Sequence, residues 1–116
     1  MRVIILTNNV LVEEETQLML QFLGHEVFIT SKQLQYYLDF ESNQSIEIFD
    51  VCIISRTVSN REAERVAIKF SQSKCSVLRE VEEINNDVDS STNLPYRQMK
   101  TKQTITELRE ALVATA

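Results

Sequence analysis

Ser55 is the nucleophilic residue whose place in the sequence is best defined. It directly follows Val51–Ile54, a continuous apolar run without alternating polar residues. Such a run is typical of a central strand in a parallel sheet that helices cover on both faces. Ser55 is therefore expected at the carboxyl end of that strand, the edge where open α/β sheets carry their ligands. A serine hydroxyl needs a neighbouring base to act as a nucleophile, and none is visible in the sequence.

The other reactive side chains, two cysteines and one histidine, predict structural roles. Cys52 and Cys75 both stand in apolar, strand-like segments, which predicts two buried thiols on neighbouring strands in a reducing compartment. A redox role would need an exposed thiol of lowered pKa, and the sequence gives no sign of one. His25 is the only histidine, so no metal-ligand spacing exists, and we expect it in a turn. We therefore predict no metal site, no cofactor and no enzymatic activity.

Composition places the chain among ordinary globular domains. Its 116 residues suffice for one domain with its own core, and we expect that domain to span 1–116. The formal net charge of −5 argues against an isolated nucleic-acid-binding module, because such modules are usually basic. No apolar run approaches the ~18 residues of a membrane-spanning helix, and no secretory hydrophobic region follows Met1. We expect a cytoplasmic protein.

The segments before the central strand alternate between strand and helix patterns. Arg2–Thr7 is a β-branched run that predicts a first strand, and Glu26–Thr30 predicts a second. The helix between them is expected to be capped by Asn8 or Asn9 and to end at Gly24. Three glutamates in its first turns favour the positive end of the helix dipole. Its buried face is predicted from four apolar residues at helical spacing: Leu11, Leu18, Met19 and Phe22.

After the second strand the alternation continues to the end of the chain. A helix is expected from Ser31 onward, and two more begin at capping boxes, in which a hydroxyl and a carboxylate can each satisfy a backbone amide. These boxes are Ser59–Glu62 and Thr104–Glu107. Cys75–Leu78 predicts a fourth strand, and an acidic stretch that could form a short helix follows it. Leu94–Met99 predicts a fifth strand at a sheet edge, because Pro95 cannot donate a ladder hydrogen bond.

Strict alternation of strands and helices predicts an α/β fold with one parallel sheet and helices on both faces. The order and the turn signals also resemble the receiver domain of bacterial response regulators over essentially the whole chain. Two segments carry the resemblance most clearly: Leu23–Val27 after the first helix, and Phe49–Ser55 at the central strand. The resemblance implies a flavodoxin-like (CheY-like) five-stranded parallel sheet with the strand order 2-1-3-4-5.

The functional residues of that family do not carry over. The acidic pair of receivers falls on Thr7 and Asn8, and their phosphorylated aspartate falls on Ser55. A neutral hydroxyl and a neutral amide cannot replace the carboxylates that Mg²⁺ prefers as ligands. The family's lysine corresponds to Lys100, or to Lys102 if the alignment slips. We therefore expect a degenerate phospho-acceptor pocket at Thr7, Asn8, Ser55 and Lys100 that accepts no phosphoryl group and holds no metal.

Receivers also carry a hydroxyl switch residue, whose position falls near Arg79 or Glu80. Neither side chain suits that role. Replacing clustered carboxylates by neutral groups removes the mutual repulsion that a metal-free acidic corner carries. We therefore expect a pocket without like-charge repulsion, in a domain that keeps one conformation without Mg²⁺ or phosphate.

Charge in the last third of the chain separates into two groups. The region after the fourth strand is acidic, whereas the last strand and helix are basic. The simplest interpretation is two solvated faces of opposite sign. A two-fold axis would instead set each acidic group against the basic group of a second copy. The OmpR-type transcription factors, which the chain resembles, dimerise through this face. The predicted face comprises Glu82, Glu83, Asp87, Asp89, Arg97, Lys100, Lys102 and Arg109.

Two functional interpretations follow from the resemblance. In the first, the chain is the N-terminal pseudo-receiver of an atypical two-component response regulator and forms a weak homodimer without phosphorylation. It would then control transcription through a C-terminal DNA-binding domain outside this chain, with no contact to a membrane. In the alternative, the chain is a stand-alone receiver-like adaptor that binds a protein partner.

Overall fold

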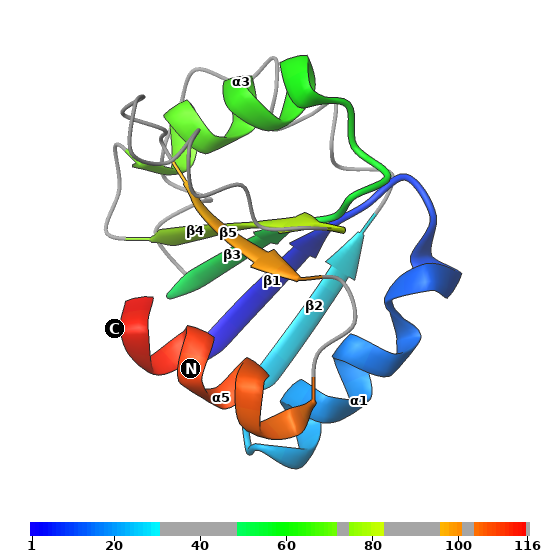
Figure 1. Ribbon diagram of the computed structural model, residues 1–116, viewed down its shortest axis with the longest axis vertical. Coiled ribbons are helices and arrows are strands. Elements are labelled where there is room, and N and C mark those ends of the chain that lie inside the picture. Colours follow the sequence, from blue (N-terminus) through cyan, green and yellow to red (C-terminus); the bar gives the residue numbers. More distant parts are fainter. Residues whose placement is uncertain (31–48, 72–74, 83–95, 101–103, 116) are drawn as a thin grey trace.

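The structure is a computed structural model, and it describes residues 1–30, 49–71, 75–82, 96–100 and 104–115. Five strands form one sheet: β1 (Arg2–Leu6), β2 (Glu26–Thr30), β3 (Val51–Ile54), β4 (Ser76–Val81) and β5 (Arg97–Lys100). Their order is β2-β1-β3-β4-β5, and every neighbouring pair is parallel. This topology confirms the predicted CheY-like α/β fold and the edge position of the last strand (Figure 1).

Helices cover both faces of the sheet. They are the 3-10 helix η1 (Val10–Glu13), α1 (Glu14–Phe22), α3 (Asn60–Ser71) and α5 (Ile105–Thr115). Figure 1 shows α3 on one face, with α1 and α5 together on the other. Because successive strand residues point to opposite faces, the central strands supply two cores. The α3 side holds Ile4, Leu6, Cys52 and Ile54, and the α1–α5 side holds Val3, Ile5, Val51 and Ile53.

Local signals in the sequence set the ends of the helices as predicted. In the first capping box the backbone N–H of Glu62 donates to Ser59 Oγ at 3.3 Å. In the second, Thr104 and Glu107 each donate a backbone N–H to the other's side chain at 3.2 Å. Gly24 follows α1 with φ of +90°, the left-handed conformation that favours glycine.

The predicted buried face of the first helix is wrong. Three of its four residues are largely exposed: Leu11 by 79%, Leu18 by 60% and Phe22 by 81%. The fourth, Met19, is partly buried against the core, and the fully buried residues of η1 and α1 are Glu13, Thr16 and Leu20. Two of these three are polar, so hydrophobicity pointed to the wrong stripe of the helix. Burial of a glutamate needs polar partners, and those partners lie on strands distant in the sequence.

The last two strands have different bounds from those predicted. β4 continues through Arg79 and Glu80, so two charged residues that were expected to follow the strand lie within it and are buried. β5 begins at Arg97. The helix expected from Ser31, the acidic stretch after Glu82 and the residues around Pro95 lie outside the described residues. Within the described ranges, no helix is both long enough and apolar enough to cross a membrane.

Candidate functional site

Polar residues from three adjacent strands meet at the carboxyl edge of the sheet. Ser55 follows β3, and its backbone N–H donates to Leu6 O of β1 at 2.8 Å. Thr7 follows β1, and Glu80 lies on β4 one residue beyond Arg79, the residue in register with Ile54. All three side chains are almost fully buried. Parallel pairing therefore brings these polar, potentially reactive side chains to the edge where open α/β folds bind ligands.

The structure brings Thr7, Asn8 and Ser55 together around Thr57. The Thr57 hydroxyl lies 3.0 Å from Thr7 Oγ1 and 2.9 Å from Ser55 Oγ. Asn8 contacts the same residue twice: its backbone N–H donates to Thr57 Oγ1 at 2.9 Å, and its side-chain amide donates to Thr57 O at 3.0 Å. Lys100 is exposed at the carboxyl end of β5, in register with Val81. Sequence reasoning gave Thr57 no role, although its hydroxyl contacts Thr7, Asn8 and Ser55.

This arrangement does not fit the Mg²⁺ that the receiver fold implies. The hydroxyls of Thr7 and Ser55 are engaged in hydrogen bonds, and Asn8 turns its NH₂ group toward the carbonyl. Mg²⁺ needs oxygen ligands with negative charge, and neither Thr7 nor Asn8 supplies one. Among the described residues, no group of three or more Asp, Glu, His or Cys side chains could hold a metal ion.

Glu13 is the residue of this pocket that the sequence analysis missed. It ends η1, which Asn9 caps by accepting the Leu11 N–H on its side chain at 3.1 Å. The Glu13 side chain is 1% exposed, and its Oε1 accepts a hydrogen bond from Ser55 Oγ at 2.5 Å. The expectation that Ser55 has no neighbouring base is therefore wrong. In the sequence, Glu13 was the first of three consecutive glutamates and looked like a surface charge at a helix start.

Glu80 approaches Glu13 from the opposite side of the pocket. It is 2% exposed, and burial, a hydrogen bond with Glu13 and the charge of Glu13 raise the pKa of Glu80 to about 9. Glu13 Oε2 and Glu80 Oε1 have no hydrogen-bond partner when both groups are ionised. A proton on Glu80 supplies the missing donor, so the two residues form a carboxyl–carboxylate pair. Two carboxyl groups that the sequence analysis did not place in this pocket therefore occupy it, and like-charge repulsion between them is avoided only while Glu80 holds its proton.

Arg79 holds the loop after β3 against the pocket. Its guanidinium donates to Ser55 O, to Val58 O at 2.7 Å and to Asn60 Oδ1 at 3.3 Å. Burial lowers the pKa of Arg79, but this group remains charged because an arginine pKa starts so high. The positive charge of Arg79, with that of Arg56, partly offsets the buried carboxyl groups. The network therefore balances charge without a bound ion.

The pocket has a nucleophile beside a base but offers no access to a substrate. Ser55 donates to a carboxylate, which is the first requirement for an activated serine. However, Thr7 and Ser55 are 0% exposed, and the neighbouring Glu13 and Glu80 are buried as well. What the arrangement can do is fix the segment before α1 to the ends of β3 and β4.

The two cysteines lie in the core on the α3 side of the sheet. Cys52 and Cys75 are buried thiols, as predicted. Burial raises the pKa of the Cys52 thiol, and it raises that of Cys75 to about 12. Both are therefore protonated thiols at neutral pH, which is the opposite of what a reactive cysteine needs.

Comparisons with known proteins show the fold. No family model and no curated protein sequence matches the chain. A response regulator receiver protein from Burkholderia phymatum has a TM-score of 0.75 at 11% identity, over 98% of this chain and 93% of that one. The chemotaxis protein CheY4 from Vibrio cholerae has a TM-score of 0.68 at 12% identity, over 99% and 98% of the two chains. A protein named for pilus assembly from Burkholderia thailandensis has a TM-score of 0.75 at 11% identity, over 99% and 97%. The chain therefore has the fold of response regulator receiver domains.

Proposed function

We propose that this chain is a phosphorylation-independent pseudo-receiver that dimerises in the cytoplasm and controls a DNA-binding output domain outside this chain. The observation that carries the proposal is the filled pocket at the carboxyl edge. Ser55 stands where the receiver fold would place the phosphorylated aspartate, and its buried hydroxyl already donates to Glu13. A hydroxyl in this state is neither an anionic acceptor for a phosphoryl group nor a charged metal ligand. The pocket therefore supports a role in regulation without catalysis.

The same contacts support a single conformational state. A ligand shifts a conformational equilibrium only through a difference in its affinity for two states. In this pocket Arg79 ties β4 to the loop after β3, and the Glu13–Glu80 pair ties β4 to the segment before α1. Because these contacts are made within the chain, we expect the regulatory signal to act on assembly or on a partner.

The proposed dimer face lies on the β4–β5 edge and α5. Glu82, Arg97 and Lys100 are exposed, and the register of β4 with β5 sets Val81, the residue before Glu82, beside Lys100. Arg109 is exposed on α5. The remaining predicted members lie outside the described residues: Glu83, Asp87, Asp89 and Lys102. Exposed ion pairs contribute only ~0–1 kcal/mol each and are screened by salt, which predicts a weak dimer.

Intact mass and sedimentation test the two halves of the proposal. Acetyl phosphate with Mg²⁺ should change neither the mass nor the sedimentation coefficient. The dimer should weaken as salt rises and again in Lys100→Glu, whereas the matched control Arg65→Glu, an exposed arginine on α3, should dimerise like the parent. A phosphoryl adduct on Ser55 would disprove phosphorylation independence. A monomer at low salt and high concentration would instead favour the adaptor function.

A further inference from the structure

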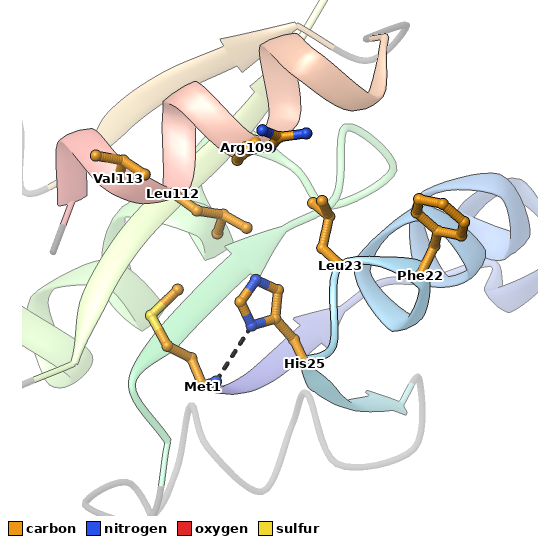
Figure 2. A pocket seen from close by; sticks show the side chains of 7 residues that line it. All are labelled: Met1, Phe22, Leu23, His25, Arg109, Leu112 and Val113. Carbon is orange, nitrogen blue, oxygen red and sulfur yellow. Dashed lines mark hydrogen bonds between the residues drawn. The ribbon is translucent and has the colours of Figure 1, made fainter.

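A groove opens at the amino edge of the sheet, opposite the filled pocket. It lies between the end of α1 and α5, with a volume of about 460 Å³, within the range of small-molecule sites. Most of its lining is apolar (Figure 2), and the lining residues are Met1, Phe22, Leu23, His25, Arg109, Leu112 and Val113. The groove therefore offers an apolar space large enough for a small molecule, on a surface that the pocket chemistry does not use.

Its polar groups are hydrogen-bond donors. The N-terminal ammonium of Met1 lies 3.2 Å from Nδ1 of His25. An ammonium group can only donate, so Nδ1 is the acceptor and the neutral ring carries its hydrogen on Nε2. Partial burial and the nearby ammonium charge lower the pKa of His25, which favours this neutral form at pH 7. Figure 2 shows the second ring nitrogen directed into the groove, toward the side of Leu23 and Leu112.

Arg109 adds a positive charge above the same space. Arg109 lines the groove from α5 (Figure 2), and no described residue forms a hydrogen bond or an ion pair with its guanidinium. The planar guanidinium fork matches a carboxylate in shape as well as in charge. A cationic donor on α5 and a neutral N–H donor in the turn before β2 thus line the same apolar groove.

We propose that this groove binds a small amphipathic carboxylate, whose apolar body packs between Leu23 and Leu112 and whose carboxylate meets Arg109 and His25 Nε2–H. A single carboxylate fits this donor set because one guanidinium and one imidazole N–H can satisfy it. A phosphate dianion would keep lone pairs without donors in an apolar surrounding. Arg109 also belongs to the proposed dimer face, so the dimer is tested separately at Lys100, which lies at the carboxyl end of β5 and does not line the groove.

Titration of the full chain with 2-naphthoate, followed by NMR, tests the proposal. We expect a Kd of about 1 mM or tighter, with shifts at Leu23, Leu112 and His25. The His25 pKa should rise on binding, because an anion beside Nε2 favours the charged ring. The neutral analogue 2-naphthylmethanol should bind at least about fivefold more weakly than the carboxylate.

Matched variants show whether the carboxylate binds in this groove. Arg109→Gln should weaken naphthoate binding about fivefold or more, whereas Arg65→Gln on α3 and Lys100→Glu on β5 should leave it unchanged. Equal affinity for the neutral analogue, unchanged affinity in Arg109→Gln or an unmoved His25 pKa would overturn the proposal. So would naphthoate binding that disappears as the chain self-associates, because a second copy would then cover the groove. If Lys100→Glu abolishes the dimer but binds naphthoate like the parent, the result supports the dimer face and leaves the groove proposal standing.

Discussion

The two ends of the sheet are built in opposite ways. At the carboxyl edge, Thr7, Ser55, Glu13 and Glu80 are buried, and nearly every polar atom is bonded to another part of the chain. At the amino edge, apolar side chains line an open groove, and the donors of Arg109 and His25 Nε2 meet no acceptor among the described residues. The edge at which open α/β folds bind ligands is closed here, and the opposite edge is hollow.

This difference shows why a fold alone does not locate a functional site. Topology brings polar residues to the carboxyl edge, but Glu13 and Arg79 satisfy them from within the chain. A ligand gains most where the protein leaves donors unpaired beside apolar surface, because binding then satisfies groups that already lack partners. By that measure the groove is the better candidate for binding a small molecule, and the pocket is a structural element.

The largest contrast is expected from removing one arginine at each end. Arg79→Met should lower the free energy of unfolding by about 3 kcal/mol, because Val58 O loses its charged donor and the buried carboxyl pair loses a compensating charge. Arg109→Met should change it by less than about 0.5 kcal/mol, as expected for an exposed residue without partners. Urea unfolding of both variants measures the difference.

Arg65→Met on α3 is the control for the loss of an arginine side chain, and it should behave like Arg109→Met. Equal stability of Arg79→Met and Arg109→Met would show that the hydrogen bonds and charge of Arg79 do not stabilise the pocket at the carboxyl edge. A change in the m-value would instead indicate an altered unfolded or native state, so midpoints should be compared only at constant m.

The second contrast concerns the proton that Glu80 binds in the folded state. The pKa of Glu80 is about 9 in the folded chain against an ordinary value of 4.5, so the folded state binds the extra proton between these values. Its contribution to stability is therefore fully present below about pH 4.5 and is lost as pH rises toward 9. We expect the free energy of unfolding to fall by about 0.5–1 kcal/mol per pH unit across this window.

Glu80→Gln should remove this dependence. Its amide keeps a donor for Glu13 Oε2 but has no proton to lose, so at pH 8 the variant should be about 2–3.5 kcal/mol more stable than the parent. At pH 4.5 the two should be nearly equal. A parent whose stability is flat from pH 5 to 8, or a variant with the same slope, would show that the pair does not hold a proton. Glu82→Gln, at an exposed position, is the matched control.

Much of the fold follows from local signals that the sequence displays directly. The apolar run at Val51–Ile54 gave the central strand, and the two capping boxes and Gly24 gave the ends of helices. These features act through neighbours a few residues apart, so one sequence suffices to identify them. The resemblance then supplied the strand order, because pairing between distant strands leaves no comparable local mark.

The contents of the pocket were predictable only in part. Thr7, Asn8 and Ser55 were found because they end strands or follow them directly. Glu13 was missed, and Glu80 was placed near the switch position without a role, because their burial depends on contacts between residues 42 or more apart in the sequence, such as Ser55 Oγ with Glu13 Oε1. A glutamate in a helix start or in an acidic stretch is normally exposed, and composition carries no signal that distinguishes these two. For the same reason the prediction assigned the wrong buried face to the first helix, because the buried residues of η1 and α1 include Glu13 and Thr16.

The smallest expected effect tests that corrected orientation of α1 at the rim of the groove. Phe22 is 81% exposed, so Phe22→Ala should change the free energy of unfolding by less than about 0.5 kcal/mol. Leu20 is fully buried among the α1–α5 core residues, and Leu20→Ala should cost about 2–4 kcal/mol because it leaves a cavity. The two substitutions lie two residues apart on one helix, so helix propensity is nearly constant and the difference reports burial.

Thermal or urea unfolding of the pair decides which residues of the helix face the core. A cost above about 2 kcal/mol for Phe22→Ala would show that Phe22 is buried in the core. Its ring would then occupy the groove, and the two ends of the sheet would no longer differ in this way.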